Sequence, residues 1–209
     1  MNPSLQTIYD KKVFAILRGV HFDDLLPVAE ALYEGGIRLL EITLNSPKAL
    51  EGISLLQAQF GKRPDRMLIG AGTVLDVDSA RAAIDAGSKF IISPNTDKET
   101  IRQTLASGVV SLPGAFTPTE IVAAHRFGGQ IIKVFPAPDP TYFKNLKGPL
   151  DNIPMMPTGG VTVDNIAAYK AAGAVAFGIG SALVKAGAHD ASSLENIRAQ
   201  SRLLVQAIS

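Results

Sequence analysis

The stretch GGQIIKVFPAP, residues 128–138, contains an apolar run that is interrupted by one lysine, Lys133. The run is too short for an isolated helix, and apolar residues on both sides of the lysine predict a strand that is buried on both faces. Such strands are typical of parallel sheets that are covered by helices. Because a lysine is rarely buried without a partner, the same stretch predicts a lysine with an unusual role.

Similar short apolar runs, ending in Gly, Pro, Ser, Thr or Asn, recur along the chain. Between them lie amphipathic stretches that have apolar residues at helical spacing and a closing glycine at the position of a C-cap. The sequence therefore predicts eight strand–helix units. The runs are VFAILRG from residue 13, LLEITLN from 39, MLIGAGTV from 67, KFIISPN from 89, VVSLPGA from 109, QIIKVFP from 130, IPMMPTGG from 153 and AVAFGIG from 174.

A (β/α)8 TIM barrel explains this rhythm better than two alternatives. Solenoid repeats share a residue consensus, which these units lack. An open doubly wound sheet also alternates strands and helices, but eight units in 209 residues with no strand left over favour the barrel. No linker or low-complexity stretch divides the chain, so residues 1–209 are predicted to form a single domain. An extra N-terminal helix is expected over residues 2–12, and a long closing helix over residues 192–208.

The composition narrows the classes of function. The 20 basic and 19 acidic residues give a net charge of +1 without a basic run, which argues against nucleic acid or an anionic membrane as a partner. The sequence has no cysteine, so disulfides, thiolate metal sites and cysteine nucleophiles are excluded. It has neither a secretion-signal pattern nor an apolar run of the roughly 18 residues that a membrane span needs. A cytoplasmic protein is the expectation.

Polar residues late in each strand are the candidates for function, because barrel sites form at the C-terminal ends of the strands. Side chains alternate along a strand, so the apolar residues of LLEITLN are expected to face the helices. Glu41, Thr43 and Asn45 then face the interior. By the same count, Lys133 and Arg18 also point inward.

The buried Glu41 and Lys133 have two interpretations. They can form a structural ion pair, but a buried pair is a poor source of stability compared with apolar packing. Alternatively, a desolvated lysine beside other cations has a lowered pKa, and its neutral amine attacks a ketone to form a Schiff base. A carboxylate such as Glu41 then moves the protons that a change at a carbon–carbon bond requires. This second interpretation, which predicts a Schiff-base aldolase, is favoured.

Glycine-rich turns after the seventh and eighth strands predict a phosphate site. PTGGVT contains Gly159 and Gly160, GIGSAL contains Gly180 and Ser181, and each turn is expected to start a helix. Bare backbone N–H groups and helix N-termini bind anions, and the Ser181 hydroxyl adds a donor. Glycines also close ordinary loops, which is the alternative for either turn taken alone.

Other segments admit a structural as well as a functional interpretation. Thr73, in GAGTV, either binds a ligand carboxylate or satisfies local backbone groups. Pro94 and Pro113, together with Phe135, are expected to form rigid pocket walls, and for the two prolines a structural role is favoured. The three histidines have no spacing with carboxylates that indicates a metal site, so a metal-dependent aldolase is disfavoured.

With these residues in view, the sequence resembles the pyruvate-forming class I aldolases. Members of that family act on 2-keto-3-deoxy-6-phosphogluconate (KDPG), its galactonate epimer (KDPGal) and 4-hydroxy-2-oxoglutarate (KHG). The resemblance extends from about residue 13 to 185, with the segments in the family's order and spacing. The segments are AILRG, LEITLNSP, IGAGTV, SPN, LPG, IKVFPA, PTGG and GIGSAL.

The resemblance implies a role for each candidate residue. Lys133 would be the Schiff-base lysine and Glu41 the proton donor and acceptor. Arg18 and Thr73 would hold the pyruvyl carboxylate. The groups that would receive the phosphate are Gly159, Gly160, Gly180 and Ser181.

The resemblance also implies the reaction and its partners. A 2-keto-3-deoxy-6-phospho sugar acid would be cleaved reversibly to pyruvate and glyceraldehyde 3-phosphate, and KHG would give pyruvate and glyoxylate. Family members are usually cytoplasmic homotrimers that need no metal or organic cofactor.

Two positions bear on the choice between the epimers. Gluconate-type enzymes carry an arginine in LEVTLRT where this chain has Asn45, and ILRG and LNSP resemble the galactonate type, in which Arg18 would take over the carboxylate clamp. PTGG with Thr158 resembles the gluconate type instead, because the galactonate type has an aliphatic residue there. A hydroxyl at position 158 can hydrogen-bond the fourth-carbon hydroxyl of the substrate.

Two other functions remain compatible with the sequence. A phosphate-binding barrel isomerase or epimerase would use the same phosphate site without an imine. A catalytically silent barrel would bind phosphorylated sugar acids as a regulator or an assembly subunit.

Overall fold

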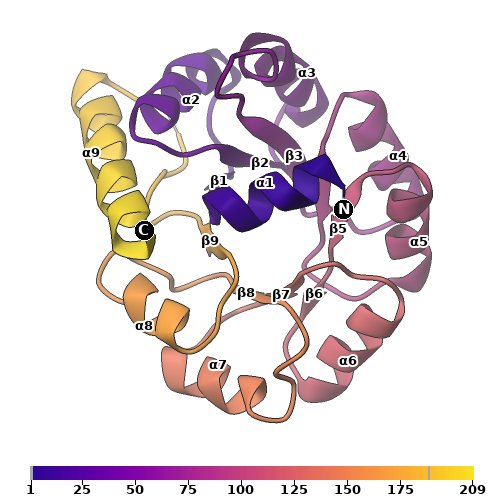
Figure 1. The fold of residues 1–209 in the computed structure, drawn as a ribbon. Coiled ribbons are helices and arrows are strands. Elements are labelled where there is room, and N and C mark those ends of the chain that lie inside the picture. The colour runs from indigo at the N-terminus through magenta and orange to yellow at the C-terminus, as the bar shows by residue number, and fades with distance from the viewer. Residues whose placement is uncertain (1, 188) are drawn as a thin grey trace.

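The computed structural model describes residues 2–187 and 189–209 as a ring of parallel strands surrounded by helices (Figure 1). The predicted α/β barrel and its additional N-terminal helix are confirmed. The strands are β1 (Val13–Leu17), β2 (Leu39–Thr43), β3 (Leu68–Gly72), β4 (Phe90–Ile92), β5 (Val110–Leu112), β6 (Gly114–Ala115), β7 (Ile132–Val134), β8 (Met155–Pro157) and β9 (Phe177–Ile179). The helices are α1 (Pro3–Lys11), α2 (Leu25–Glu34), α3 (Ala49–Phe60), α4 (Val77–Asp85), α5 (Lys98–Ala106), α6 (Pro118–Arg126), α7 (Pro140–Lys147), α8 (Ile166–Ala171) and α9 (Ala191–Ile208), with a short 3₁₀ turn η1 (Phe22–Asp24) before α2.

Within the described residues, the β elements close into a ring of eight strands. Six pair in the order β5-β4-β3-β2-β1-β9, and three pair as β6-β7-β8. β5 and β6 are two parts of one predicted strand, which the structure divides at Pro113. The amide of Phe135, after β7, donates to the Ala115 carbonyl of β6 at 3.0 Å. A bridge between Thr158 and Gly178 joins β8 to β9 and completes the ring.

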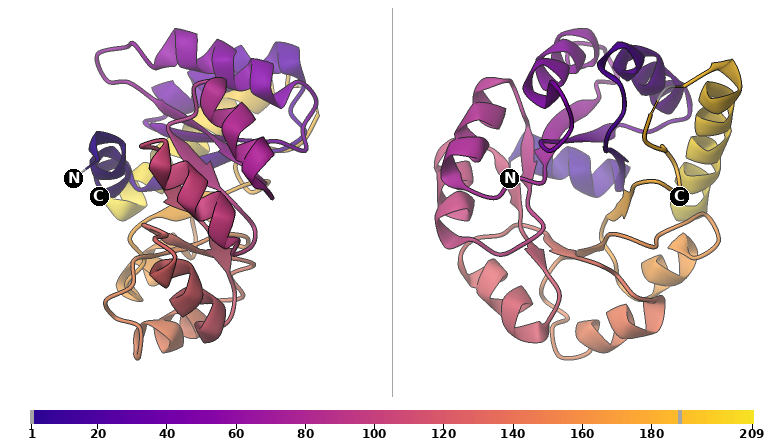
Figure 2. Two further views of the ribbon diagram at one scale, coloured as in Figure 1. Left: turned by 90° about the vertical axis from the view of Figure 1, so that its right-hand side faces the viewer. Right: turned by 180° about the vertical axis from the view of Figure 1, so that it is seen from behind.

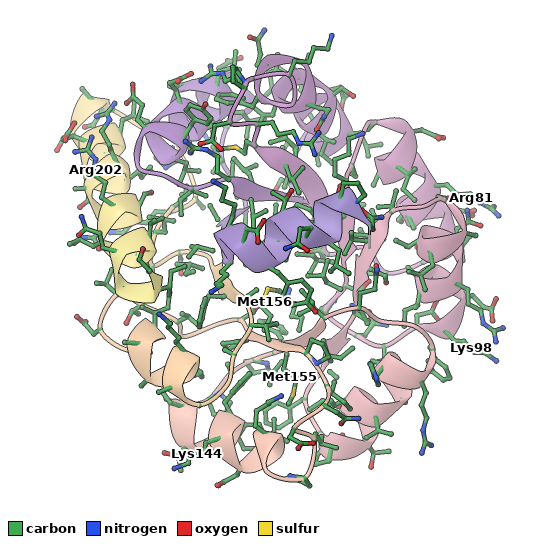
Figure 3. All side chains as sticks on the ribbon, viewed as in Figure 1. Arg81, Lys98, Lys144, Met155, Met156 and Arg202 are labelled. Carbon is green, nitrogen blue, oxygen red and sulfur yellow. The ribbon has the colours of Figure 1, made fainter. Side chains whose placement is uncertain are left out.

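Alternate strand residues face two different cores, as the predicted alternation requires. In β8 the side chain of Met156 belongs to the core inside the ring, whereas Met155 packs between the ring and the helices (Figure 3). Inside the ring, the side chains of Phe14 and Phe90 pack edge to face, with their ring centroids 5.1 Å apart. The interior core consists of Ile8, Phe14, Leu39, Leu68, Phe90, Ile92, Val110, Leu112, Ile131, Met156 and Ala176.

Helix α1 closes the N-terminal end of the ring. It crosses in front of the strands in Figure 1 and lies behind them in the right panel of Figure 2. Ile8 is fully buried in the interior core, with Leu5 and Tyr9 packed against it. The helix starts at Asn2, whose side chain accepts a hydrogen bond from the Ser4 amide at 2.8 Å. Because this end is filled with apolar side chains, the opposite end of the ring is where a polar site can form.

Most of the loops that leave that opposite end run into helices with side-chain caps. Four aspartates accept a backbone N–H from the first turn of the helix that follows them, and Thr117 forms a capping box with Glu120. These side chains are therefore engaged in holding helix ends. The capping aspartates are Asp76, Asp97, Asp139 and Asp190.

Charged side chains cover the outside of the helices. Those labelled on α4, α5, α7 and α9 in Figure 3 project away from the ring. Among residues 2–187 and 189–209, no helix combines the length and the apolar character needed to cross a membrane.

Candidate active site

A cavity of about 450 Å³ lies at the C-terminal ends of the strands, away from α1. Most of the predicted site residues line it. Three do not: Glu41 is buried in β2, Asn45 contacts the Arg18 side chain, and the Pro113 carbonyl accepts the backbone N–H of Lys133 at 2.9 Å. The predicted residues that line the cavity are Arg18, Thr73, Pro94, Lys133, Phe135, Thr158, Gly159, Gly160, Gly180 and Ser181.

Lys133 and Glu41 are both buried at the ring interior. Lys133, in the middle of β7, is 3% exposed, and Glu41, in the middle of β2, is 0% exposed. Neither carboxylate oxygen of Glu41 has a hydrogen-bond partner in the described part of the chain. None of the ion pairs found between described residues joins Glu41 to Lys133. Since buried polar groups are nearly always paired, an unpartnered carboxyl group beside a cavity indicates a group available to a ligand.

Gly72, which sequence reasoning did not single out, makes room for this carboxyl group. A Cβ atom at Gly72 would lie 1.6 Å from Glu41 Oε1. At Gly70, two residues earlier in β3, a Cβ would come within 2.4 Å of the Phe90 ring. Both glycines face the interior of the ring, and the alternation of Leu68, Gly70 and Gly72 along LIGAG is the signal that would have identified them.

The surroundings shift the pKa values of both buried groups toward their uncharged forms. Burial raises the pKa of Glu41, and the positive charges of Lys133 and Arg18 oppose part of that rise. Burial lowers the pKa of Lys133, the Glu41 charge opposes the shift, and the Arg18 charge adds to it. The Phe135 ring, whose centroid is 4.9 Å from Lys133 Nζ, is part of the apolar wall. The environment therefore favours a protonated carboxyl beside a neutral, nucleophilic amine.

Arg18 holds a fixed position at the rim through two side chains from neighbouring loops. Its guanidinium donates to Asn45 Oδ1 at 3.1 Å and to Thr73 Oγ1 at 3.3 Å. Thr73 has a φ of +58°, a left-handed conformation that a β-branched residue rarely adopts. Such strain persists where the surroundings enforce it, commonly at ligand sites. The cationic group therefore faces the cavity in a defined orientation.

The turn after β8 is preorganised. Gly159 and Gly160 both have a φ of +82°, which strongly favours glycine. Asn165 braces the turn: its side chain donates to the Gly160 carbonyl and accepts from the Thr162 amide, both at 2.8 Å.

The turn after β9 differs from the prediction. GIGSAL was expected to start a helix, but it forms a single turn in which the amides of Leu183 and Val184 donate to the Gly180 carbonyl. The chain then leaves the helical path because Gly187 pairs with Val20 in a short parallel bridge. The expected helix start is therefore wrong, since α9 begins only at Ala191. Gly180 and Ser181 still line the cavity.

Thr158 presents an unused hydroxyl to the cavity. The residue is 4% exposed, and its Oγ1 has no hydrogen-bond partner within residues 2–187 and 189–209. Gly178 leaves space for this hydroxyl, because a Cβ there would lie 2.4 Å from Oγ1. Ile16, Val161, Gly178 and Ala182 also line the cavity. Of these, Ile16 and Gly178 follow from the alternation along β1 and β9, whereas Val161 and Ala182 depend on how the loops turn.

The fold and this cavity define the molecule as an α/β barrel with a buried lysine, a buried carboxyl group and glycine-rich turns at one end. No group of three or more His, Asp or Glu side chains in the described residues is arranged to hold a metal ion. The family model of the KDPG and KHG aldolases matches residues 5–200. The chain belongs to this aldolase family.

Individual relatives agree with that assignment. The chain is 36% identical over 198 residues to a 2-dehydro-3-deoxy-6-phosphogalactonate aldolase of Escherichia coli K12, with 93% of each chain covered. It is 42% identical over 151 residues to a 2-dehydro-3-deoxy-phosphogluconate aldolase of Pseudomonas aeruginosa, covering 71% of this chain and 67% of the relative. A solved structure described as native KDPGal superposes with a TM-score of 0.86, at 36% identity and with 93% of each chain covered.

Proposed function

We propose that this protein is a class I aldolase that cleaves a 2-keto-3-deoxy-6-phospho sugar acid reversibly to pyruvate and D-glyceraldehyde 3-phosphate. One observation carries the proposal: Lys133, whose pKa burial lowers, lines the cavity, and the unpartnered, buried carboxyl group of Glu41 is close enough to interact with it electrostatically. A neutral amine is the form that attacks a ketone. A structural ion pair would instead be expected to bring the two charges into contact.

The reaction begins with the attack of Lys133 Nζ on the C2 ketone to form a carbinolamine. Glu41 gives its proton to the departing hydroxyl, so that water leaves and a cationic imine remains. The Glu41 carboxylate then takes the proton of the C4 hydroxyl while the C3–C4 bond breaks. The bonding electrons move into the imine, which becomes a neutral enamine, and the aldehyde is released.

The second half of the cycle restores the enzyme. Glu41 returns the proton to C3 of the enamine, which regenerates the imine. Water then adds to C2 while Glu41 accepts its proton, and collapse of the carbinolamine releases pyruvate and frees Lys133. One carboxyl group thus serves each acid–base step at carbon and at the departing or entering water. Among the described residues, no Asp or Glu side chain lines the cavity itself, so the buried Glu41 is the candidate for this role.

The remaining groups would bind the two anionic ends of the substrate. Arg18 and Thr73 would hold the pyruvyl carboxylate, because a guanidinium fixed by two hydrogen bonds is well suited to a planar anion. Elsewhere in the cavity lining, the groups that would receive the phosphate are Gly159, Gly160, Gly180 and Ser181.

The choice of epimer rests on Thr158 and Asn45. The unpartnered Thr158 hydroxyl supports contact with the C4 hydroxyl of the gluconate epimer. Asn45, by supporting Arg18, supports a galactonate-type carboxylate clamp. Relatives named for either epimer match this chain. We therefore propose activity on both epimers, with KHG as a further substrate.

A coupled assay of pyruvate release tests the activity. The protein is expected to release pyruvate from both KDPG and KDPGal, and to accept KHG. Absence of pyruvate from all three compounds would exclude the aldolase and favour the silent barrel. Isomerisation of ketose phosphates that borohydride does not trap would favour the isomerase instead.

The family resemblance also supports a homotrimer in the cytoplasm and a reaction that needs no metal or organic cofactor. Closure of the ring from β1 to β9 supports one domain over residues 1–209. Light scattering on the purified protein is expected to give three times the mass of the single chain. Treatment with a chelator is expected to leave pyruvate release unchanged.

A further inference from the structure

The hydroxyl groups of Ser46 and Thr43 form hydrogen bonds that involve the backbone on both sides of Arg18. The amide of Gly19 donates to Ser46 Oγ at 2.9 Å. Thr43 Oγ1 lies 3.0 Å from Ser46 Oγ and 3.3 Å from the Leu17 carbonyl. Leu17, Arg18 and Gly19 are consecutive, so these contacts connect the peptide groups that flank Arg18.

The donors and acceptors in this group allow one arrangement. A hydroxyl has a single proton to donate, the Gly19 N–H can only donate, and the Leu17 carbonyl can only accept. Ser46 must therefore donate to Thr43, and Thr43 to Leu17. Both ends of this hydrogen-bonded series are backbone groups. Loss of either hydroxyl therefore interrupts the series of hydrogen bonds that links the Gly19 amide to the Leu17 carbonyl.

The same loop also holds the guanidinium. Asn45 precedes Ser46 and accepts from the Arg18 side chain at 3.1 Å. Arg18 itself is exposed, whereas Thr43 is fully buried and Ser46 is half-buried. Neither Thr43 nor Ser46 lines the cavity. Their contacts with the substrate would be indirect, through the position of Arg18.

We propose that Ser46 and Thr43 are positioning residues for Arg18 and thereby set the affinity for the pyruvyl carboxylate. The inference rests on the proposed function of Arg18. Removal of the Ser46 hydroxyl frees the Gly19 amide and lets the Arg18 backbone shift, which weakens carboxylate binding. The chemical step at Lys133 and Glu41 stays intact, because neither residue contacts this series.

The test is a pyruvate titration of the borohydride-trapped adduct on Lys133, together with steady-state kinetics. In Ser46→Ala, the half-saturating pyruvate concentration and KM are expected to rise about tenfold, because displaced binding groups lose affinity steeply. The limiting adduct yield and kcat should change by less than about twofold. Thr43→Val should behave similarly. Ser46→Thr, which keeps the hydroxyl, should retain the affinity of the unsubstituted protein. Ser54→Ala is the matched control, because it removes an exposed hydroxyl on α3 that donates to the Ala86 carbonyl at 3.1 Å and has no hydrogen bond with the backbone around Arg18.

A double-mutant cycle separates positioning from a general structural role. If Ser46 acts through Arg18, Ser46→Ala should add nothing to the loss of affinity in an Arg18→Ala background. The same tenfold rise in both backgrounds, or an unchanged affinity in Ser46→Ala alone, would overturn the inference. Absence of any adduct in the unsubstituted protein is a different result, which would overturn the proposed function and the inference with it.

Discussion

At the residue scale, the burial of Lys133 supports the proposed reactivity of its amine and also costs stability. An amine that is charged in the unfolded chain must lose its proton or its hydration when it folds into this interior. The Glu41 carboxyl group, buried beside the same cavity, has the complementary shift. A pair of groups whose pKa values are displaced in these directions is suited to nucleophilic and acid–base chemistry near neutral pH.

The first prediction concerns Lys133→Met, which is expected to be inactive, folded and more stable than the unsubstituted protein. Because folding lowers the pKa of Lys133, the unfolded state binds more protons, and stability rises with pH up to the ordinary lysine pKa of about 10.4. The substitution removes this penalty, so the gain should be largest near neutral pH and should shrink toward pH 10. Thermal unfolding across this range measures it; loss of the fold would support a structural ion pair instead.

The second prediction concerns the pH dependence of kcat/KM. Activity is expected to fall on the acid side, where the Lys133 amine is protonated, and on the alkaline side, where Glu41 loses the proton that its raised pKa retains. The two limbs report apparent pKa values of the pair and not of single residues. Glu41→Gln should lower kcat by about 10²–10⁴-fold and remove the alkaline limb. An unchanged alkaline limb in this variant would assign that limb to another group.

At the element scale, strands β2, β3 and β7 each contribute one property to the site. β7 carries the lysine, β2 carries the carboxyl group, and β3 contributes space through its inward-facing glycines. The helices contribute less directly: they cover the ring, and their first turns donate hydrogen bonds to the capping side chains of the loops. α1 stands apart from these, because it fills the end of the ring away from the cavity.

The role of β3 gives a third prediction. Gly72→Ala places a methyl group where Glu41 Oε1 lies, so the carboxyl group must move and kcat/KM should fall by about 100-fold or more. Gly148→Ala is the control, because the nearest atom to its Cβ is 3.5 Å away and its φ of −53° suits alanine. Circular dichroism should show both variants folded. Equal activity in the two variants would show that Glu41 needs no exact placement.

The position of α1 gives a fourth prediction, in which stability changes and chemistry does not. Ile8→Ala removes a fully buried side chain from the interior core and should lower the free energy of unfolding by about 2–4 kcal/mol. Gln6→Ala, at an exposed position on the same helix, should change it by less than about 0.5 kcal/mol. Denaturant titration measures both. A loss of kcat in Ile8→Ala under conditions where it is folded would mean that α1 also acts on the site.

At the scale of the whole molecule, the sequence predicts what is periodic and misses what depends on distant contacts. The eight-unit ring and the inward orientation of Glu41 and Lys133 follow from alternation along short buried strands. The division of the fifth strand at Pro113 could not be predicted from this alternation. The single turn at Ser181 could not be predicted from it either, because that turn ends where Gly187 pairs with the distant Val20. For the same reason, the hydrogen bond between Asn45 and Arg18 could not be read from either segment alone.

The central claim is that Lys133 forms a covalent imine with a keto acid. Reduction with borohydride in the presence of pyruvate, followed by digestion and mass spectrometry, tests this claim most directly. The account predicts one stable carboxyethyl adduct, located on Lys133 and absent without pyruvate or in Lys133→Met. No adduct on Lys133, or an adduct on another lysine while activity is intact, would contradict it.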